Sequence, residues 1–266
     1  MKTLDPEQLK NIIVAAAREE LLPRFARVSR RQKIDGSIVT EADLALQRRI
    51  ARQLKQHWPD TVFLGEEMTA EEQAGLLESA QPVWCLDPLD GTSNFAAGIP
   101  YFAVSLALVQ QGEVTLGLVY DPLRDECFAA GKGRGAAVNG QPLVLAETGL
   151  GLEETTAIID FKRLSVPLAE RLVSKPPFAS QRNFGASALD WCWLAAGRGH
   201  LYLHGKQNIW DYAAGNLVFD EAGGYATTLS GGRVFINALQ PRSVVAAVDE
   251  NLFAAWTAWL GVGLEP

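Results

Sequence analysis

Two aspartates with the spacing of shared metal ligands lie in one short segment, Asp87-Pro88-Leu89-Asp90-Gly91-Thr92. The proline fixes the bend after an apolar run, so Asp87 and Asp90 can face one point across a tight turn. Thr92-Ser93-Asn94 then opens a predicted helix, whose first N–H groups lack partners inside the helix and can hold phosphate oxygens. The segment predicts metal ligands beside a phosphate cradle, although an ordinary Asx turn with a helix cap also explains the motif taken alone.

Three further acidic residues stand at the ends of predicted elements, where loop-borne chemistry gathers. Asp43 follows Val39-Thr40, Glu66 follows a strand, and Asp211 stands at a helix start. Grouped carboxylate oxygens are the hard ligands that Mg²⁺ prefers. The acidic pattern therefore predicts a magnesium site built from distant parts of the chain.

The elements that position these acids differ between the two halves of the chain. In the first half, apolar positions at helical spacing predict helices over residues 5–28 and 40–57. Apolar runs at 61–64 and 82–86 predict short buried strands, and three strand-like runs with short turns over 101–130 predict an antiparallel meander.

Strands and helices alternate after about residue 150, which is typical of an α/β arrangement. The alternation predicts strands at 155–160, 200–204 and 243–248, and helices at 166–174, 186–197, 210–224 and 249–260. We therefore expect an α+β subdomain over residues 1–150 that carries most metal ligands, and an α/β subdomain over residues 151–266 that supplies Asp211 and the specificity residues.

Bulk composition restricts the classes of function. The 266 residues carry 24 Lys and Arg against 31 Asp and Glu, a net charge of -7. So acidic a chain disfavours nucleic-acid binding, and it favours metal cations over a basic pocket for holding an anionic substrate. The N-terminal segment does not read as a signal peptide, and no apolar run is long enough to span a membrane. The scattered cysteines, Cys85, Cys127 and Cys192, predict a reducing, cytoplasmic location.

Four stretches, in order, resemble the inositol monophosphatase family, within a wider group of lithium-sensitive, magnesium-dependent phosphatases. They are Lys33–Asp43 (KIDGSIVTEAD), Gly65-Glu66-Glu67, Trp84–Phe95 (WCLDPLDGTSNF) and Trp210–Gly215 (WDYAAG), the last closed by Glu221-Ala222-Gly223-Gly224. The resemblance covers almost the whole chain. It implies an α+β and α/β fold, layered α-β-α-β-α, with a larger, mostly antiparallel N-terminal sheet, a smaller C-terminal sheet, and metals between them. It also implies a mobile lid near Lys33.

The resemblance implies a set of ligands for two to three Mg²⁺ ions. Glu66, Asp87 and the backbone carbonyl of Leu89 would bind the first ion. Asp87, Asp90 and Asp211 would bind the second, and a third, looser ion would share Glu66.

The resemblance also implies roles for the residues that face the water and the phosphate. Glu66 and Thr92 would orient the attacking water, and Asp43 would support Thr92 through a hydrogen bond. The N–H groups of Gly91 and Thr92 would bind phosphate, with Ser93 and the second-ion ligand Asp90 also beside the substrate.

Inositol monophosphate is the substrate that the resemblance implies, cleaved by a metal-activated water without a covalent enzyme intermediate. His204 departs from the family pattern, because relatives carry a substrate-binding glutamate seven positions before the helix aspartate. His204 therefore either contacts substrate or is an ordinary strand-end residue. Ala186 lies in the corresponding substrate-facing stretch, which lacks the serine-rich pattern of a bisphosphate nucleotidase. Histidinol phosphate, a sugar phosphate or bisphosphate, and 3′-phosphoadenosine phosphate stay open as substrates.

Two other classes of function compete with this one. Haloacid-dehalogenase-like phosphatases use a D-x-D-G-T motif, whereas Asp87 and Asp90 are three positions apart. A non-catalytic metal-binding homologue is the second rival, although no family ligand is lost. The glycine-rich segment 131–135 lacks the spacing of a P-loop and is expected to be a hairpin turn. The expected partners are a small phosphorylated metabolite and a second copy of the chain in a homodimer.

Overall fold

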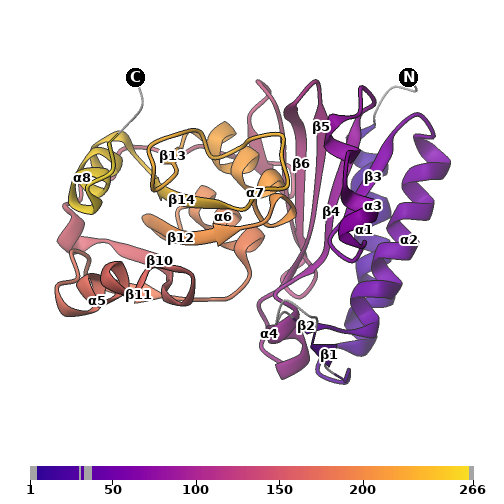
Figure 1. Cartoon of the computed structure of the whole chain (residues 1–266), viewed down its shortest axis with the longest axis horizontal. Helices are drawn as coiled ribbons and strands as arrows, with labels where there is room; N and C mark the ends of the chain where they lie inside the picture. The colour runs from indigo at the N-terminus through magenta and orange to yellow at the C-terminus, as the bar shows by residue number, and fades with distance from the viewer. Residues whose placement is uncertain (1–4, 30, 33–37, 264–266) are drawn as a thin grey trace.

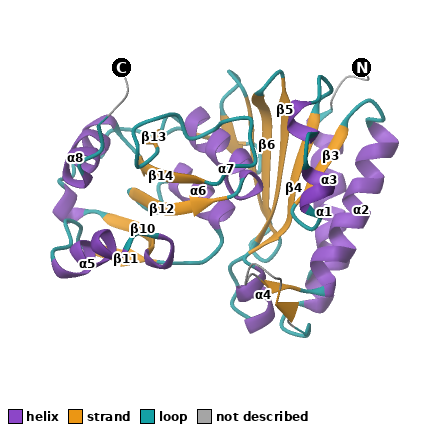
Figure 2. Cartoon of the chain, in the orientation of Figure 1, coloured by secondary structure: helices purple, strands orange, loops and turns teal. Residues whose placement is uncertain are grey.

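The computed structural model describes residues 5–29, 31–32 and 38–263, and its two large sheets alternate with three helical layers (Figure 1). One outer layer holds α1 (Pro6–Glu20) and α2 (Glu41–His57), the middle layer α6 (Ser187–Ala195) and α7 (Ile209–Glu221), and the other outer layer α5 (Val166–Ser174) and α8 (Glu250–Leu260). Figure 2 shows the same order by secondary structure. The layered α-β-α-β-α fold expected from the sequence is confirmed.

The first helical layer starts and stops at residues with clear local causes. Thr40 forms a capping box with Asp43 at the start of α2. Helix α1 ends at Glu20, well before residue 28, because Pro23 lacks an N–H and belongs to the 3₁₀ turn that follows, Leu22–Arg24. Both helices bury an apolar face, and α2 packs against the larger sheet.

The larger sheet has seven strands in chain order. They are β3 (Val62–Gly65), β4 (Val83–Asp90), β5 (Ala103–Gln110), β6 (Glu113–Asp121), β7 (Glu126–Gly131), β8 (Ala136–Val138) and β9 (Gln141–Leu143). β3 pairs parallel with β4 and every later pair is antiparallel, which confirms the predicted meander. β4 continues past residue 86 to Asp90, and its register with β5 shifts between Asp87 and Asp90.

Short elements border this sheet. They are β1 (Arg31–Gln32) paired with β2 (Ile38–Val39), α3 (Ala70–Gln73), a 3₁₀ turn (Leu76–Glu78) and α4 (Thr92–Ala97). α4 follows β4 after a single glycine, so the end of a central strand leads directly into a helix start.

The smaller sheet has five strands in the order β11-β10-β12-β14-β13. They are β10 (Thr156–Asp160), β11 (Ser180–Arg182), β12 (Leu201–Gln207), β13 (Tyr225–Thr227) and β14 (Arg242–Ala247). β10 pairs parallel with both β11 and β12, and the remaining pairs are antiparallel. The chain passes from the larger sheet, which ends at Leu143, to the smaller sheet, which begins at Thr156. The subdomain boundary at residue 150 stays a prediction, because the two sheets share one apolar core through α6 and α7.

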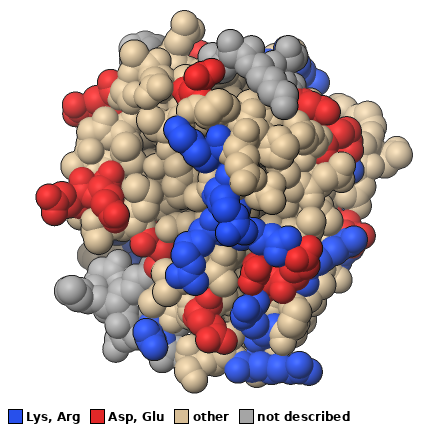
Figure 3. All heavy atoms as spheres, turned by 90° about the vertical axis from the view of Figure 1, so that its right-hand side faces the viewer, with Lys and Arg blue, Asp and Glu red and all other residues tan. Residues whose placement is uncertain are grey.

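The surface over α1 and α2 is not uniformly acidic. Figure 3 shows a band of Lys and Arg side chains on this face, with Asp and Glu beside it. Helix α2 contributes exposed Arg48, Arg52 and Lys55, while Arg49 pairs with Glu20 at 3.2 Å. Across the described ranges, no helix is both long and apolar enough to cross a membrane. The lid expected near Lys33 lies outside the described residues.

Candidate active site

Two buried aspartates lie at the end of β4, and each carboxylate is held by a backbone N–H. Asp87 Oδ1 accepts a hydrogen bond of 2.9 Å from the Leu89 N–H, which closes the turn around Pro88. Asp90 Oδ2 accepts one of 2.6 Å from the Ala188 N–H at the start of α6. The side chains are 2% and 8% exposed, respectively. Each aspartate therefore has a fixed orientation and a second oxygen that is not bound to these N–H groups.

Strand pairing brings Glu66 next to these aspartates. β3 and β4 run parallel with Gly65 opposite Leu86, so the residues that follow both strands lie at one edge of the sheet. The Glu66 N–H donates to the Leu86 carbonyl at 3.1 Å. The Glu66 side chain lies close enough to Asp87 to interact with it through a hydrogen bond.

Asp211 reaches the same place from the second half of the chain. It is the third residue of α7, and its Oδ2 accepts a hydrogen bond of 2.8 Å from the Asn208 N–H in a capping box. This cap fixes the carboxylate at the helix start, where α7 packs against β4 and β5.

The electrostatics show that the four carboxylates are neighbours. Burial, followed by the negative charges of Glu66, Asp90 and Asp211, raises the pKa of Asp87 well above its usual value. Burial and the charge of Asp211 likewise raise the pKa of Asp90. Neighbouring buried carboxylates repel one another unless protons or cations compensate them. The donor set of hard oxygens therefore fits Mg²⁺.

The four carboxylates lie near one another, but they do not surround a common point as the ligands of one ion would. In the described part of the chain, no three His, Cys, Asp or Glu side chains are placed to hold an ion together. The fit to Mg²⁺ therefore rests on the chemistry of the four carboxylates rather than on a coordination sphere that is already in place.

Thr92 and Asp43 form a second polar unit beside the aspartates. Thr92 Oγ1 lies 2.9 Å from both Asp43 Oδ1 and the Leu89 carbonyl oxygen, and it donates to one of them at a time. Asp43 Oδ2 accepts from the Thr40 N–H at 2.8 Å and from the Thr40 hydroxyl. Burial raises the pKa of Asp43, although these hydrogen bonds oppose the shift. These contacts thus hold the Thr92 hydroxyl in place at the first residue of α4.

The turn that leads into α4 depends on Gly91. Its φ is +88°, and a Cβ there would lie 3.0 Å from both the Ala186 Cβ and the Tyr101 carbonyl oxygen. The helix start carries Thr92 and exposed Ser93, and its first N–H groups have no intrahelical acceptor. Such N–H groups are suited to phosphate oxygens.

The two expected specificity residues lie in buried positions. Ala186 is 1% exposed and packs behind Gly91, so its contact with a substrate stays a prediction. His204 is 5% exposed and lies on β12 beside Asp160, with His204 Nε2 and Asp160 Oδ2 3.5 Å apart.

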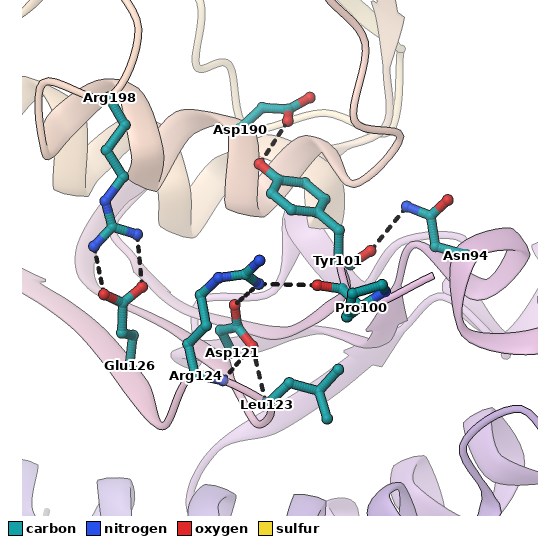
Figure 4. A network of polar contacts seen from close by, with 9 residues as sticks. All are labelled: Asn94, Pro100, Tyr101, Asp121, Leu123, Arg124, Glu126, Asp190 and Arg198. Carbon is teal, nitrogen blue, oxygen red and sulfur yellow. Dashed lines mark hydrogen bonds and ion pairs between the residues drawn. The ribbon is translucent and has the colours of Figure 1, made fainter. Parts of the chain in front are cut away.

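A buried polar network behind the site was not predicted from the sequence. Tyr101 donates a hydrogen bond of 2.8 Å to Asp190 on α6, and Asn94 on α4 donates to the Tyr101 carbonyl at 2.8 Å (Figure 4). Burial raises the pKa of Asp190 to about 8. The network links α4 to α6 across the two halves. Its only sequence signal was an acidic residue inside an otherwise apolar helix pattern.

The glycine-rich turn after β7 serves another purpose. Its three N–H groups at Gly133, Arg134 and Gly135 donate to the Glu221 carboxylate at 2.7, 3.1 and 2.7 Å. The turn therefore binds the end of α7, as a hairpin turn rather than a P-loop.

Comparison with known proteins agrees with this geometry. A sequence profile of the inositol monophosphatase family matches residues 5–258. Inositol monophosphatase 1 of Solanum lycopersicum is 38% identical over 228 residues, covering 82% of this chain and 81% of that protein. A fructose-1,6-bisphosphatase/inositol-1-monophosphatase of Thermotoga maritima is 35% identical over 244 residues, covering 86% and 90%.

Solved structures show the same fold. An inositol monophosphatase from Thermotoga maritima superposes with a TM-score of 0.80 at 29% identity, covering 96% of this chain and 94% of that one. A structure described as an IMPase/NADP phosphatase complexed with Mg²⁺ and phosphate shares the fold at 22% identity and a TM-score of 0.80. Members of the family are generally metal-dependent phosphoric monoester hydrolases. This chain belongs to the inositol monophosphatase family and is an enzyme of that class.

Proposed function

We propose that the chain is a Mg²⁺-dependent phosphomonoesterase that hydrolyses a small phosphate monoester such as inositol monophosphate. The observation that carries the proposal is the group of four neighbouring carboxylates, beside a helix start whose Thr92 hydroxyl is held by Asp43. Carboxylates that can bind metal ions and N–H groups that can donate hydrogen bonds to a phosphate then lie within one site, as hydrolysis of a phosphate ester requires.

The proposed ligands follow from the carboxylates and one carbonyl. Glu66, Asp87 and the carbonyl of Leu89 would hold one ion, and Asp87, Asp90 and Asp211 a second. A third ion would share Glu66. Bound Mg²⁺ would supply a more acidic water and positive charge against the negative charge that develops on the ester oxygen.

Side chains and backbone N–H groups of the chain would orient the water and bind the phosphate. Thr92 and Glu66 would orient the attacking water. The Thr92 hydroxyl donates its hydrogen bond to Asp43 Oδ1 or to the Leu89 carbonyl, so its lone pairs are left to accept a hydrogen bond from that water. The N–H groups of Gly91, Thr92 and Ser93 would hold phosphate oxygens at the start of α4. Since the water attacks directly, no side chain needs to become phosphorylated.

The test is Mg²⁺-dependent release of phosphate from a panel of esters. The panel holds inositol 1-phosphate, histidinol phosphate, fructose 1,6-bisphosphate and 3′-phosphoadenosine phosphate. We expect release that requires Mg²⁺, stops with a chelator and falls with Li⁺ in the millimolar range, with the highest kcat/KM for inositol 1-phosphate. Asp90→Asn and Asp211→Asn should abolish release, whereas Glu153→Gln, an exposed carboxylate outside the site, should not.

Two outcomes would favour other functions. A folded protein that releases no phosphate from any ester would favour the non-catalytic metal-binding homologue. Trapping of a phosphorylated aspartate would favour the haloacid-dehalogenase-like mechanism instead.

We further propose a homodimer in the cytoplasm. Cys85, Cys127 and Cys192 are all free and buried, which suits a reducing compartment. Light scattering after size exclusion would measure the mass in solution, and the value for a single 28.9 kDa chain would contradict the dimer.

A further inference from the structure

The side chain of Asn94 joins α4 to two segments outside that helix. Asn94 is the third residue of α4, and it is buried. Its Nδ2 donates to the Tyr101 carbonyl oxygen at 2.8 Å and to the Phe184 carbonyl oxygen at 2.6 Å. An amide NH₂ group carries two protons, so both hydrogen bonds can form at once. One side chain therefore ties α4 both to the segment before β5 and to the segment before α6.

The two acceptor carbonyls belong to a packed unit at the start of α6. The Tyr101 and Phe184 rings stack with 4.8 Å between their centroids. The Tyr101 hydroxyl donates to Asp190 Oδ1 at 2.8 Å, in the first turn of α6 (Figure 4). Gly185 follows with φ +80°, and a Cβ there would lie 3.5 Å from Asn94 Nδ2, in van der Waals contact. The carbonyls that Asn94 binds are therefore held in place by α6.

The start of α6 also holds Asp90, whereas α4 carries Thr92. The Ala188 N–H of α6 donates to Asp90 Oδ2 at 2.6 Å. Thr92 precedes Asn94 by two residues on α4, and its hydroxyl lies 2.9 Å from Asp43 Oδ1. One helix therefore positions a proposed metal ligand and the other positions the hydroxyl proposed to orient water. The contacts of Asn94 connect these two helices.

The covalent link between Asp90 and Thr92 does not fix their relative position. Only Gly91 lies between them along the chain, and glycine has the widest range of backbone conformations. A small rotation about Gly91 would move Thr92 while Asp90 stayed bound to α6. Because both amide protons of Asn94 are donated to carbonyls, its side chain is suited to preventing that rotation rather than to binding a substrate.

We propose that Asn94 is a positioning residue that fixes the Thr92 hydroxyl relative to Asp90, so that the water oriented by Thr92 faces the carboxylate site. Displacement of a reacting group by about 1 Å can lower a rate 10²-fold, so such a contact matters for turnover. Asn94 acts through Thr92 and touches neither the water nor the ester. This inference rests on the proposed phosphatase function.

The test uses two variants of Asn94 and a matched control. Asn94→Ala removes both donors, and Asn94→Ser keeps one shorter donor and replaces Asn94→Ala in the test if that variant does not fold. Asn139→Ala is the control, because Asn139 also binds two backbone groups, the Cys127 N–H at 2.9 Å and the Asp125 carbonyl at 2.8 Å. Asn139 lies between β8 and β9, at the edge of the larger sheet opposite β3.

Two measurements separate positioning from stability. The first is kcat and KM for inositol 1-phosphate and phenyl phosphate at saturating Mg²⁺, for each variant alone and combined with Thr92→Val. The second is amide hydrogen exchange in the metal-free protein at Phe95, whose N–H donates to the Gly91 carbonyl at 3.0 Å. Thermal unfolding confirms that each variant is folded.

The expected result is a loss of kcat that depends on Thr92. Asn94→Ala should lower kcat about tenfold for both esters and change KM by less than about twofold, because both reactions use the same water. Added to Thr92→Val, it should lower kcat by less than about twofold, since the hydroxyl through which it acts is gone. Asn94→Ser should be intermediate, and Asn139→Ala should keep wild-type kcat.

Hydrogen exchange should report the same change without metal or substrate. Asn94→Ala should speed exchange at Phe95 by about tenfold, because the first turn of α4 loses its attachment to α6. Asn139→Ala should leave this rate unchanged.

Four results would overturn the inference. They are wild-type kcat in a folded Asn94 variant, an equal loss of kcat with and without Thr92→Val, an equal loss in Asn139→Ala, and unchanged exchange at Phe95. Failure of the proposed function looks different, because the wild-type protein would then release no phosphate from any ester with Mg²⁺, whatever the exchange rates.

Discussion

Thr92 Oγ1 lies 2.9 Å from Asp43 Oδ1, although 49 positions separate the two residues along the chain. Asp43 belongs to the first turn of α2 and Thr92 to the first turn of α4, so the contact joins two helix starts. Because the Thr40 N–H and hydroxyl hold the other carboxylate oxygen, Asp43 presents Oδ1 in a single direction.

This relationship predicts how turnover depends on the hydroxyl. Thr92→Val keeps the shape of the side chain but removes the group proposed to orient water, so kcat should fall by about 10²-fold or more while KM changes little. Thr92→Ser should retain most of kcat because it keeps the hydroxyl. Steady-state kinetics with inositol 1-phosphate at saturating Mg²⁺ would measure both. A large rise in KM at unchanged kcat would assign Thr92 to binding instead.

Gly91 should resist substitution for two separable reasons. Gly91→Ala places a methyl group 3.0 Å from Ala186 and Tyr101 in a backbone of φ +88°. We expect a loss of about 2 kcal/mol or more in the free energy of unfolding, from left-handed strain together with crowding. Gly133→Ala is the matched control, because Gly133 has φ +69° and nothing within 4 Å. Equal losses in urea unfolding for the two variants would show that crowding at Gly91 contributes nothing.

The sequence predicted best those elements that depend on residues close together along the chain. Apolar spacing, caps and turn residues predicted α2, the meander and the alternation of the second half, because each depends on neighbours along the chain. Strands β11 and β13 were missed, since three residues are too few to show a period. The end of α1 was misplaced because Pro23 outweighs the apolar spacing that continues beyond it.

The parts of the site that were not predicted depend on contacts between distant elements. Asp160 ends a predicted strand, but its pairing with His204 follows from the parallel register of β10 and β12, which the sequence does not reveal. Asp190 and Tyr101 meet only because α6 lies between the two sheets. Such pairs have no fixed sequence spacing, so pattern reasoning has nothing to detect.

Mg²⁺ should stabilise the fold in a pH-dependent way. The folded-state pKa values of Asp87 and Asp90 are raised, so the folded protein keeps protons that the unfolded chain loses, and stability falls as pH rises toward those values. Mg²⁺ needs the ionised carboxylates, so its stabilising effect should be larger at about pH 8 than at about pH 5.5. At 100 times its Kd, the ion should raise Tm by roughly 5 °C or more.

Calorimetry with and without Mg²⁺ at both pH values would measure this difference. Asp87→Asn should raise Tm in the absence of Mg²⁺, because it removes a repelled charge, and should also abolish the gain from Mg²⁺. Glu153→Gln serves as the control and should keep the wild-type gain. An equal Mg²⁺ effect at the two pH values would contradict a carboxylate site with raised pKa values.

Asp190 should make stability depend on pH without taking part in metal binding. Burial raises its pKa to about 8 in the folded protein, above the value near 3.8 expected in the unfolded chain. Between these values the folded state holds a proton that the unfolded state lacks, so this group lowers stability as pH rises through the interval, by at most about 1.4 kcal/mol per pH unit.

Asp190→Asn removes that titration and keeps an oxygen that can accept from Tyr101 at 2.8 Å. Urea unfolding from about pH 5 to pH 9 should therefore show a flatter pH profile for Asp190→Asn, with its largest advantage over wild type near pH 8 and above. Tyr101→Phe is the companion variant: it removes the hydrogen bond that lowers the pKa of Asp190, so the decline should extend to higher pH. If wild type and Asp190→Asn had parallel profiles, Asp190 would not titrate in this range, and the network between α4 and α6 would contain a carboxylate that is already ionised.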